Sequence, residues 1–226
     1  MSLKLVLFDC DGTLVDSGHA IVDCMTMAFE ACGHLAPHRS EILHVIGLTL
    51  DHAIAEIRPS LSKGDVADIE HHYKTVFRQQ RLAGDLPEPL YPDAAEVVKQ
   101  LNAAGFLLGV ATGKSRRGLD AVLARHDLTD QFVTLQTADR VPAGKPAPDM
   151  VLQACGETGA EPVDVIVVGD TCYDMEMAQN AGARGVGVDW GYHPAEMLHN
   201  AGCLHVVEEF KQLPGIIIDA YQRREK

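Results

Sequence analysis

Two aspartates, Asp9 and Asp11, stand two positions apart just after the apolar run that begins the chain. Carboxylates at this spacing can share a metal ion. They can also act separately, one attacking a phosphorus atom while the other exchanges a proton with the leaving oxygen. Gly12 follows them and permits a tight turn with close backbone approach. Alone, Asp-x-Asp-Gly is also an ordinary polar turn after a strand, so the assignment depends on further residues.

Three later motifs supply such residues. Thr112 and Gly113 offer a hydroxyl and backbone N–H groups to an anion, although Thr112 alone could simply cap a helix. Lys145, between a glycine and a proline, could neutralise a phosphate or an attacking carboxylate, or be an ordinary loop lysine. Asp170 and Asp174, one helical turn apart, complete an all-oxygen cluster that suits Mg²⁺ rather than zinc, with N-capping as the alternative for Asp170.

These motifs follow short, uninterrupted apolar runs, which predict strands that are buried on both faces. Helical patterns separate the runs, so the sequence predicts an α/β protein with a doubly wound parallel sheet and right-handed crossovers. Ligands bind at the carboxyl edge of such sheets, where the motifs would converge. The predicted strands cover residues 3–8, 106–111, 163–168 and 185–188, and the predicted helices cover 92–103, 116–125, 149–155 and 173–181.

A helical insertion interrupts this alternation after the first strand. No strand pattern appears between it and the Pro-rich residues 86–89, which predict a junction back to the sheet. We therefore predict an α/β core of residues 1–16 and 87–226 and a small helical domain of residues 17–86. Its predicted helices cover residues 20–32, 39–46, 50–57 and 65–81.

The composition excludes several functional classes. With 19 basic and 32 acidic side chains the formal charge is −13, which disfavours binding to nucleic acid or to an anionic membrane. We find no secretory signal and no apolar run near the ~20 residues that span a bilayer. The six cysteines form no C-x-x-C pair, so we expect free thiols in a cytoplasmic protein, with Cys10 packed in the core.

The four motifs, in this order, resemble those of the haloacid dehalogenase superfamily in its phosphatase branch. The matching segments are Asp9–Thr13, Ala111–Gly113, Gly144–Pro146 and Gly169–Asp174. The resemblance implies that Asp9 is the nucleophile and becomes an aspartyl-phosphate. It implies that Asp11 protonates the leaving group and then activates water, as hydrolysis of a phosphate ester requires. It also implies that the helical insertion is a cap domain.

The same resemblance implies a magnesium ion and a phosphate-binding set. Mg²⁺ would be bound by Asp9, the backbone carbonyl of Asp11 and Asp170, with Asp174 as a further ligand or as a partner of the ligands. Thr112, Gly113 and Lys145 would bind the phosphoryl group. His44 lies near a position where relatives carry a basic residue, and Arg58, Tyr73, Arg78 and Arg81 are other possible substrate contacts in the cap.

The wording of the first motif is most similar to that of phosphoglycolate phosphatases, and the substrate would then be a small phosphorylated metabolite. Pyrophosphatases, nucleotidases and sugar phosphatases fit the same motif. A sugar phosphomutase with the same machinery and a non-catalytic relative are further alternatives. A dinucleotide-binding oxidoreductase is excluded because Asp-Gly-Thr replaces the glycine fingerprint after the first strand. The family contains monomers and dimers, so we expect a monomer or a homodimer.

Overall fold

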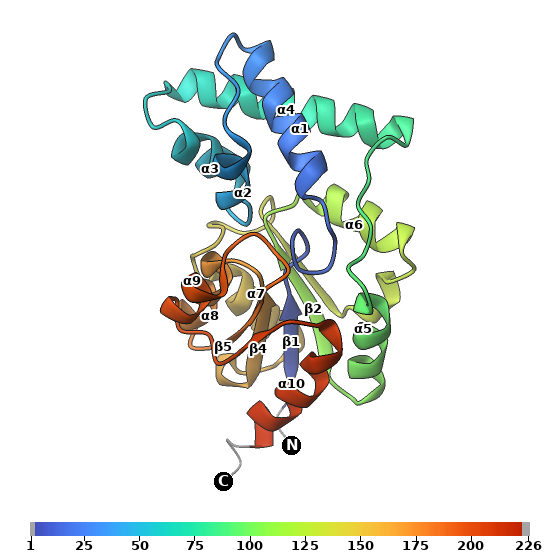
Figure 1. Cartoon of the computed structure of the whole chain (residues 1–226). Helices are drawn as coiled ribbons and strands as arrows, with labels where there is room; N and C mark the ends of the chain where they lie inside the picture. The colour runs from blue at the N-terminus through green and yellow to red at the C-terminus, as the bar shows by residue number, and fades with distance from the viewer. Residues whose placement is uncertain (1–2, 223–226) are drawn as a thin grey trace.

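The computed structural model describes residues 3–222 and contains one parallel sheet (Figure 1). Its strand order is β3-β2-β1-β4-β5-β6, and every neighbouring pair is parallel. The chain winds outward from the central β1 in both directions, which confirms the predicted doubly wound α/β fold. The strands are β1 (Leu5–Phe8), β2 (Leu107–Thr112), β3 (Thr134–Thr137), β4 (Val165–Gly169), β5 (Arg184–Val188) and β6 (Val206–Val207).

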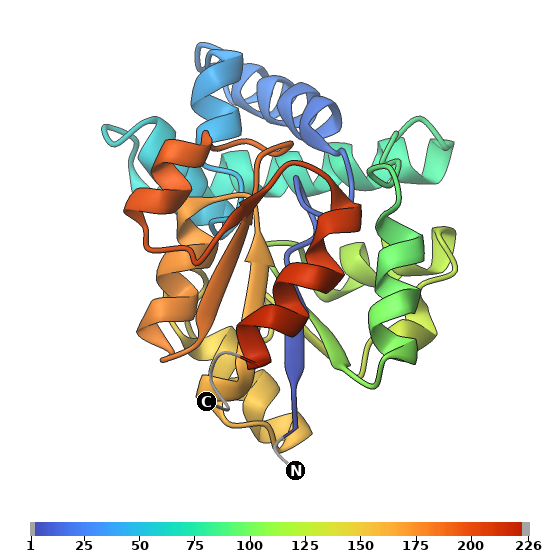
Figure 2. The same ribbon diagram turned by 60° about the horizontal axis from the view of Figure 1, so that its bottom comes forward.

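Helices cover both faces of the sheet. Val6 and Phe8 of β1 pack in one hydrophobic cluster with α5, α6 and α10, and Figure 2 shows α10 crossing this face beside α5. Leu5 and Leu7 point to the other face and pack with α7 and α8, as strand alternation requires. The core helices are α5 (Ala94–Ala103), α6 (Arg116–Arg125), α7 (Asp149–Thr158), α8 (Cys172–Asn180), α9 (Ala195–Asn200) and α10 (Leu213–Gln222), with short 3₁₀ turns η1 (Thr129–Gln131), η2 (Pro162–Asp164) and η3 (Phe210–Gln212).

Two strands were absent from the prediction. β3 reads Thr-Leu-Gln-Thr, so no apolar run marks it. The hydroxyl of its buried Thr134 and the Nε2 group of Gln136 form hydrogen bonds with each other and with Glu157. β6 has only two residues, too short for any periodicity to appear. Both are edge strands of the sheet, so each pairs with a neighbouring strand on one side only.

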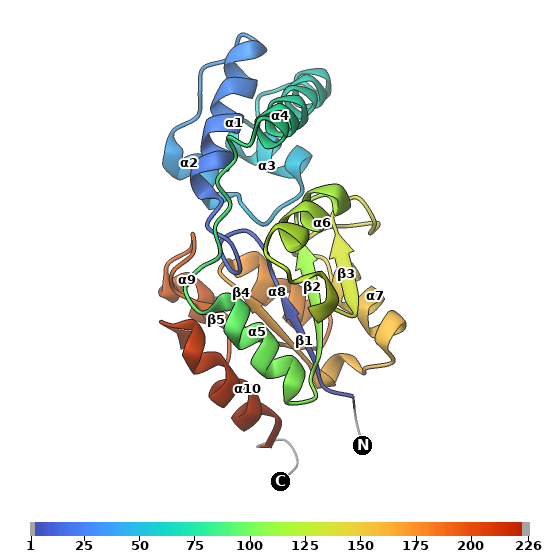
Figure 3. The same cartoon turned by 90° about the vertical axis from the view of Figure 1, so that its right-hand side faces the viewer.

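The helical cap lies above the carboxyl ends of the strands (Figures 1 and 3). It has its own core, in which Met25, Phe29, Ile42, Ile54 and Ile69 are at most 2% exposed. No helix within residues 3–222 is long and apolar enough to cross a membrane. The cap helices are α1 (Gly18–Ala31), α2 (Arg39–His44), α3 (Leu50–Ile57) and α4 (Lys63–Ala83).

The cysteines agree with the sequence analysis. Cys10 is fully buried in the hydrophobic cluster that also contains Val6 and Phe8, so its predicted packing role is confirmed. Burial raises the pKa of its thiol, which keeps it protonated. The free thiols are Cys10, Cys24, Cys32, Cys155, Cys172 and Cys203.

Candidate active site

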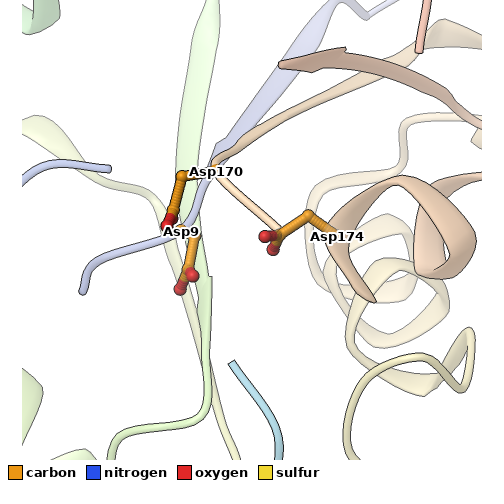
Figure 4. A group of neighbouring side chains, drawn as sticks. All are labelled: Asp9, Asp170 and Asp174. Carbon is orange, nitrogen blue, oxygen red and sulfur yellow. The ribbon is translucent and has the colours of Figure 1, made fainter. Parts of the chain in front are cut away.

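Three aspartates meet at the carboxyl edge of the sheet. Phe8 pairs with Val168 of β4, so Asp9 and Asp170, which follow β1 and β4, emerge side by side. Asp174 approaches from the first turn of α8 (Figure 4). One oxygen from each of the three carboxylates lies within 4.8 Å of the others, and all three side chains are buried.

Lys145 is the cation that faces this group. Its Nζ lies 2.9 Å from Oδ1 of Asp9 and 2.6 Å from Oδ1 of Asp174, and the residue is 1% exposed. Although burial lowers the pKa of Lys145, the carboxylates of Asp174 and Asp9 hold it above its usual range. Two of the three carboxylates, those of Asp9 and Asp174, therefore contact one ammonium.

Burial and the excess negative charge raise the pKa values of two of these carboxyl groups. Burial, opposed by Lys145 and reinforced by Asp174, raises the pKa of Asp9 to about 7. Burial also raises the pKa of Asp170 well above its usual value, and Asp9 and Asp174 add to the effect. Another positive charge at this place would stabilise the ionised forms.

The donor set of this group fits a magnesium ion. Oδ2 of Asp9 is buried and has no hydrogen-bond partner among the described residues, which is costly for a carboxylate oxygen unless a cation contacts it. Oxygen-only ligands suit Mg²⁺. In Asp174, Oδ2 accepts hydrogen bonds from the backbone and hydroxyl of Thr171, while Oδ1 faces Lys145. Asp9 thus has a carboxylate oxygen left for a metal ion, whereas Asp174 contacts Lys145.

The turn after β1 approaches Asp170 closely. Gly12 has φ +83°, and a Cβ at this position would lie 2.3 Å from Oδ2 of Asp170. Thr13 donates its hydroxyl to Oδ1 of Asp170 at 2.8 Å, and the backbone of Tyr192 donates to Oδ2 at 2.9 Å. Only glycine permits this backbone conformation together with this approach. Sequence reasoning missed Thr13 and Tyr192; the former stands within the first motif.

The predicted phosphate-binding residues lie beneath the cap. Thr112 ends β2 and is 1% exposed, and its Oγ1 accepts a hydrogen bond from the backbone of Lys114 at 3.2 Å. A Cβ on Gly113 would lie 2.7 Å from the carbonyl oxygen of Leu48 and 3.1 Å from that of Gly47. The cap loop between α2 and α3 therefore rests directly on Gly113.

Asp11 lies apart from the three-carboxylate group. Its Oδ1 accepts hydrogen bonds from Ser17 and from Lys114, whose Nζ is 2.5 Å away. Lys114 also contacts Glu88 at 3.0 Å. Although burial lowers the pKa of Lys114, Asp11 and Glu88 hold it above its usual range. Sequence reasoning missed Ser17, Lys114 and Glu88; only Lys114, directly after Thr112-Gly113, carried a positional signal.

Two of the cap residues that were predicted as possible substrate contacts form ion pairs within the protein. Arg58 contacts Glu41 within the cap at 2.7 Å. Arg81 reaches out of the cap to Glu88 at 2.9 Å. His44 stacks on His193 from the core, with ring centroids 4.9 Å apart.

Comparisons with known proteins give the family. The haloacid dehalogenase-like hydrolase family matches residues 6–188. The chain is 34% identical over 212 residues to the probable phosphatase IndB of Dickeya dadantii, covering 93% of this chain and 92% of that protein. It is 27% identical over 223 residues to a phosphoglycolate phosphatase of Vibrio vulnificus, covering 96% of each. A hydrolase from Pseudomonas syringae, 24% identical, has the same fold, with a TM-score of 0.84 over 96% of this chain and 98% of that one. The resemblance seen in the sequence is confirmed: the chain belongs to the haloacid dehalogenase-like hydrolase family.

Proposed function

We propose that the protein is a Mg²⁺-dependent phosphatase that hydrolyses a small phosphate monoester through an aspartyl-phosphate on Asp9. The observation that carries this proposal is the environment of the Asp9 carboxylate. Lys145 contacts one of its oxygens, and the other is buried without a hydrogen-bond partner within residues 3–222, close to the carboxylates of Asp170 and Asp174. The carboxylate of Asp9 is therefore both the proposed nucleophile and one of the oxygen ligands that would hold the metal ion.

The proposed reaction has two steps. A carboxylate oxygen of Asp9 attacks phosphorus, a bond forms between them, and the bond from phosphorus to the ester oxygen breaks as Asp11 gives that oxygen a proton. Water then attacks the aspartyl-phosphate, Asp11 takes a proton from the water, and phosphate leaves with Asp9 restored. Lys145, the hydroxyl of Thr112 and the backbone N–H of Gly113 hold the phosphoryl oxygens.

Mg²⁺ held by Asp9, the backbone carbonyl of Asp11 and Asp170 would supply positive charge that offsets the repulsion between carboxylate and phosphate. This chain's own contribution is to place the charges in advance. Thr13 and the backbone of Tyr192 fix the Asp170 carboxylate, and Asp174 fixes Lys145.

The proposed substrate is a small phosphorylated metabolite such as phosphoglycolate. The wording of the first motif and the Vibrio vulnificus relative, named a phosphoglycolate phosphatase, support it. The close approach of the cap to the core also supports a small leaving group, because the carbonyl oxygens of Gly47 and Leu48 lie against Gly113.

The test is phosphate release from a panel of esters, measured with Mg²⁺ and again with EDTA. The panel contains phosphoglycolate, pyrophosphate, nucleoside monophosphates, sugar phosphates and p-nitrophenyl phosphate. We expect Mg²⁺-dependent release that Asp9→Asn reduces to background while the variant stays folded. Asp120→Asn, on the exposed side of α6, is the control and should leave the rate unchanged. Turnover retained by Asp9→Asn, or release that EDTA leaves unchanged, would refute the proposal.

A further inference from the structure

A further buried acid, Glu88, lies next to the candidate active site. Glu88 is in the segment that connects α4 of the cap to α5 of the core, and it is 2% exposed. Its carboxylate contacts Arg81 at 2.9 Å, Lys114 at 3.0 Å and Arg125 at 3.7 Å. A carboxylate removed from water needs such partners. What distinguishes Glu88 is that its partners come from both domains.

The backbone around Glu88 is fixed to the core. The guanidinium of Arg125 donates to the carbonyl of Leu86 at 2.9 Å, and a ring nitrogen of His126 lies 2.8 Å from the carbonyl of Glu88 itself. Both contacts come from the end of α6. Hydrogen bonds to the core therefore fix the backbone segment that carries Glu88.

Lys114 connects Glu88 to Asp11. Its ammonium lies between the two carboxylates, 3.0 Å from Glu88 and 2.5 Å from Asp11, and its side chain is 8% exposed. The ring of Phe77 in α4 covers the pair of cations, with its centroid 5.5 Å from Nζ of Lys114 and 5.1 Å from Cζ of Arg81. Phe77 and Arg81 of the cap thus complete a cluster whose acids belong to the core.

We propose that Glu88 is a positioning residue for proton transfer at Asp11: it fixes Lys114 against Oδ1 of Asp11 and joins that contact to the cap through Arg81. The inference rests on the proposed phosphatase function. Both hydrogen bonds to the Asp11 carboxylate, from Lys114 and Ser17, are made to Oδ1. Oδ2 is therefore the atom that gives its proton to the leaving oxygen and later takes one from water.

Glu88 gives the buried ammonium of Lys114 a second carboxylate partner besides Asp11. A buried ammonium needs a fixed counterion, and Glu88 is itself fixed by Arg81 and Arg125. Glu88 contacts the same ammonium and takes no part in the proton transfer. Lys114 can therefore hold Oδ1 of Asp11 throughout the cycle.

The experiment compares two leaving groups in Glu88→Gln. An alkyl phosphate, the one that the wild type hydrolyses fastest in the panel, needs a proton on its leaving oxygen, whereas p-nitrophenolate leaves without one. We expect kcat for the alkyl ester to fall about 10- to 100-fold, a part of the ~10²–10⁴-fold that general acid–base catalysis supplies. The value for p-nitrophenyl phosphate should change less than about threefold on the same grounds. Asp120→Asn should change neither.

Two further variants keep the test decisive if Glu88→Gln is poorly folded. The double variant Arg81→Gln, Glu88→Gln removes one charge of each sign, and Lys114→Gln removes the group that Glu88 positions; circular dichroism melting identifies the folded proteins. Each should show the same selective loss for the alkyl ester. Equal losses for both esters would show a structural role only and overturn the inference. A folded wild type that hydrolyses neither ester would instead refute the proposed function.

Discussion

Replacing Lys145 by methionine tests whether its ammonium stabilises the folded, metal-free protein by offsetting the charge of the buried carboxylates. Methionine keeps an unbranched chain that fills most of the same space, so the change is mainly one of charge. Lys145 contacts both Asp9 and Asp174, and all three side chains are at most 1% exposed. Within residues 3–222 no other cation pairs with either carboxylate.

The magnitude follows from this burial. Removing one partner of a buried ion pair costs about 3–5 kcal/mol, because the remaining charge stays out of water. For a chain of this size about 1 kcal/mol changes Tm by about 2–4 °C, so Tm in EDTA should fall by about 6–20 °C. Saturating Mg²⁺ stabilises the folded state that binds it, so the variant should gain more from Mg²⁺ than the wild type does.

The assay is thermal unfolding followed by circular dichroism, in EDTA and in excess Mg²⁺. Lys211→Met is the control, since Lys211 pairs with Asp93 at the surface, where such pairs contribute little. Its Tm should match that of the wild type in both buffers. A Lys145→Met protein whose Tm in EDTA also matches that of the wild type would refute the reasoning about charge in this group.

Two more predictions concern pH and the cap. The folded-state pKa values of Asp9, about 7, and of Asp170 are raised above their unfolded values, so the metal-free protein should lose stability as pH rises through about 7. Melting in EDTA between pH 5.5 and 8.5 should show this loss and Mg²⁺ should reduce it; a Tm that rises with pH would contradict the assignment. Gly113→Ala should lower kcat/KM by about 10²-fold, because its methyl group would meet the carbonyl of Leu48 at 2.7 Å and displace the cap. Gly156→Ala, where the methyl group meets no atom within 4 Å, is the control and should retain wild-type kcat/KM.

The fold was predictable wherever an element carries its own periodic signal. The apolar runs at β1, β2, β4 and β5 predicted the centre of the sheet, and the helical patterns predicted α3 and α6 to the residue. Boundaries moved where capping decides them: α4 begins at Lys63, two residues before its predicted start, because Ser62 and Asp65 form a capping box. β3 depends on hydrogen bonds to a distant helix, which no local pattern contains.

The candidate site was predictable to the extent that topology brings strand ends together. In a parallel sheet Asp9 and Asp170 meet at one edge without any knowledge of the side chains between them. The separate role of each carboxylate in this group could not be predicted from the sequence. That Asp174 holds Lys145 while its other oxygen caps α8 follows from the rotamers of both side chains, which packing sets.

The position of Glu88 links the cap to the chemistry more directly than the sequence suggested. The two connections between cap and core are hydrogen-bonded to each other, from Asp16 to Pro89 at 2.9 Å and from Tyr91 to Leu14 at 3.0 Å. Glu88 adjoins this junction, and its contacts extend to Arg81 on one side and, through Lys114, to Asp11 on the other. A movement of α4 that released Arg81 would change the partners of Glu88. The carboxylate of Asp11, which we propose transfers the proton, would therefore respond to the position of the cap.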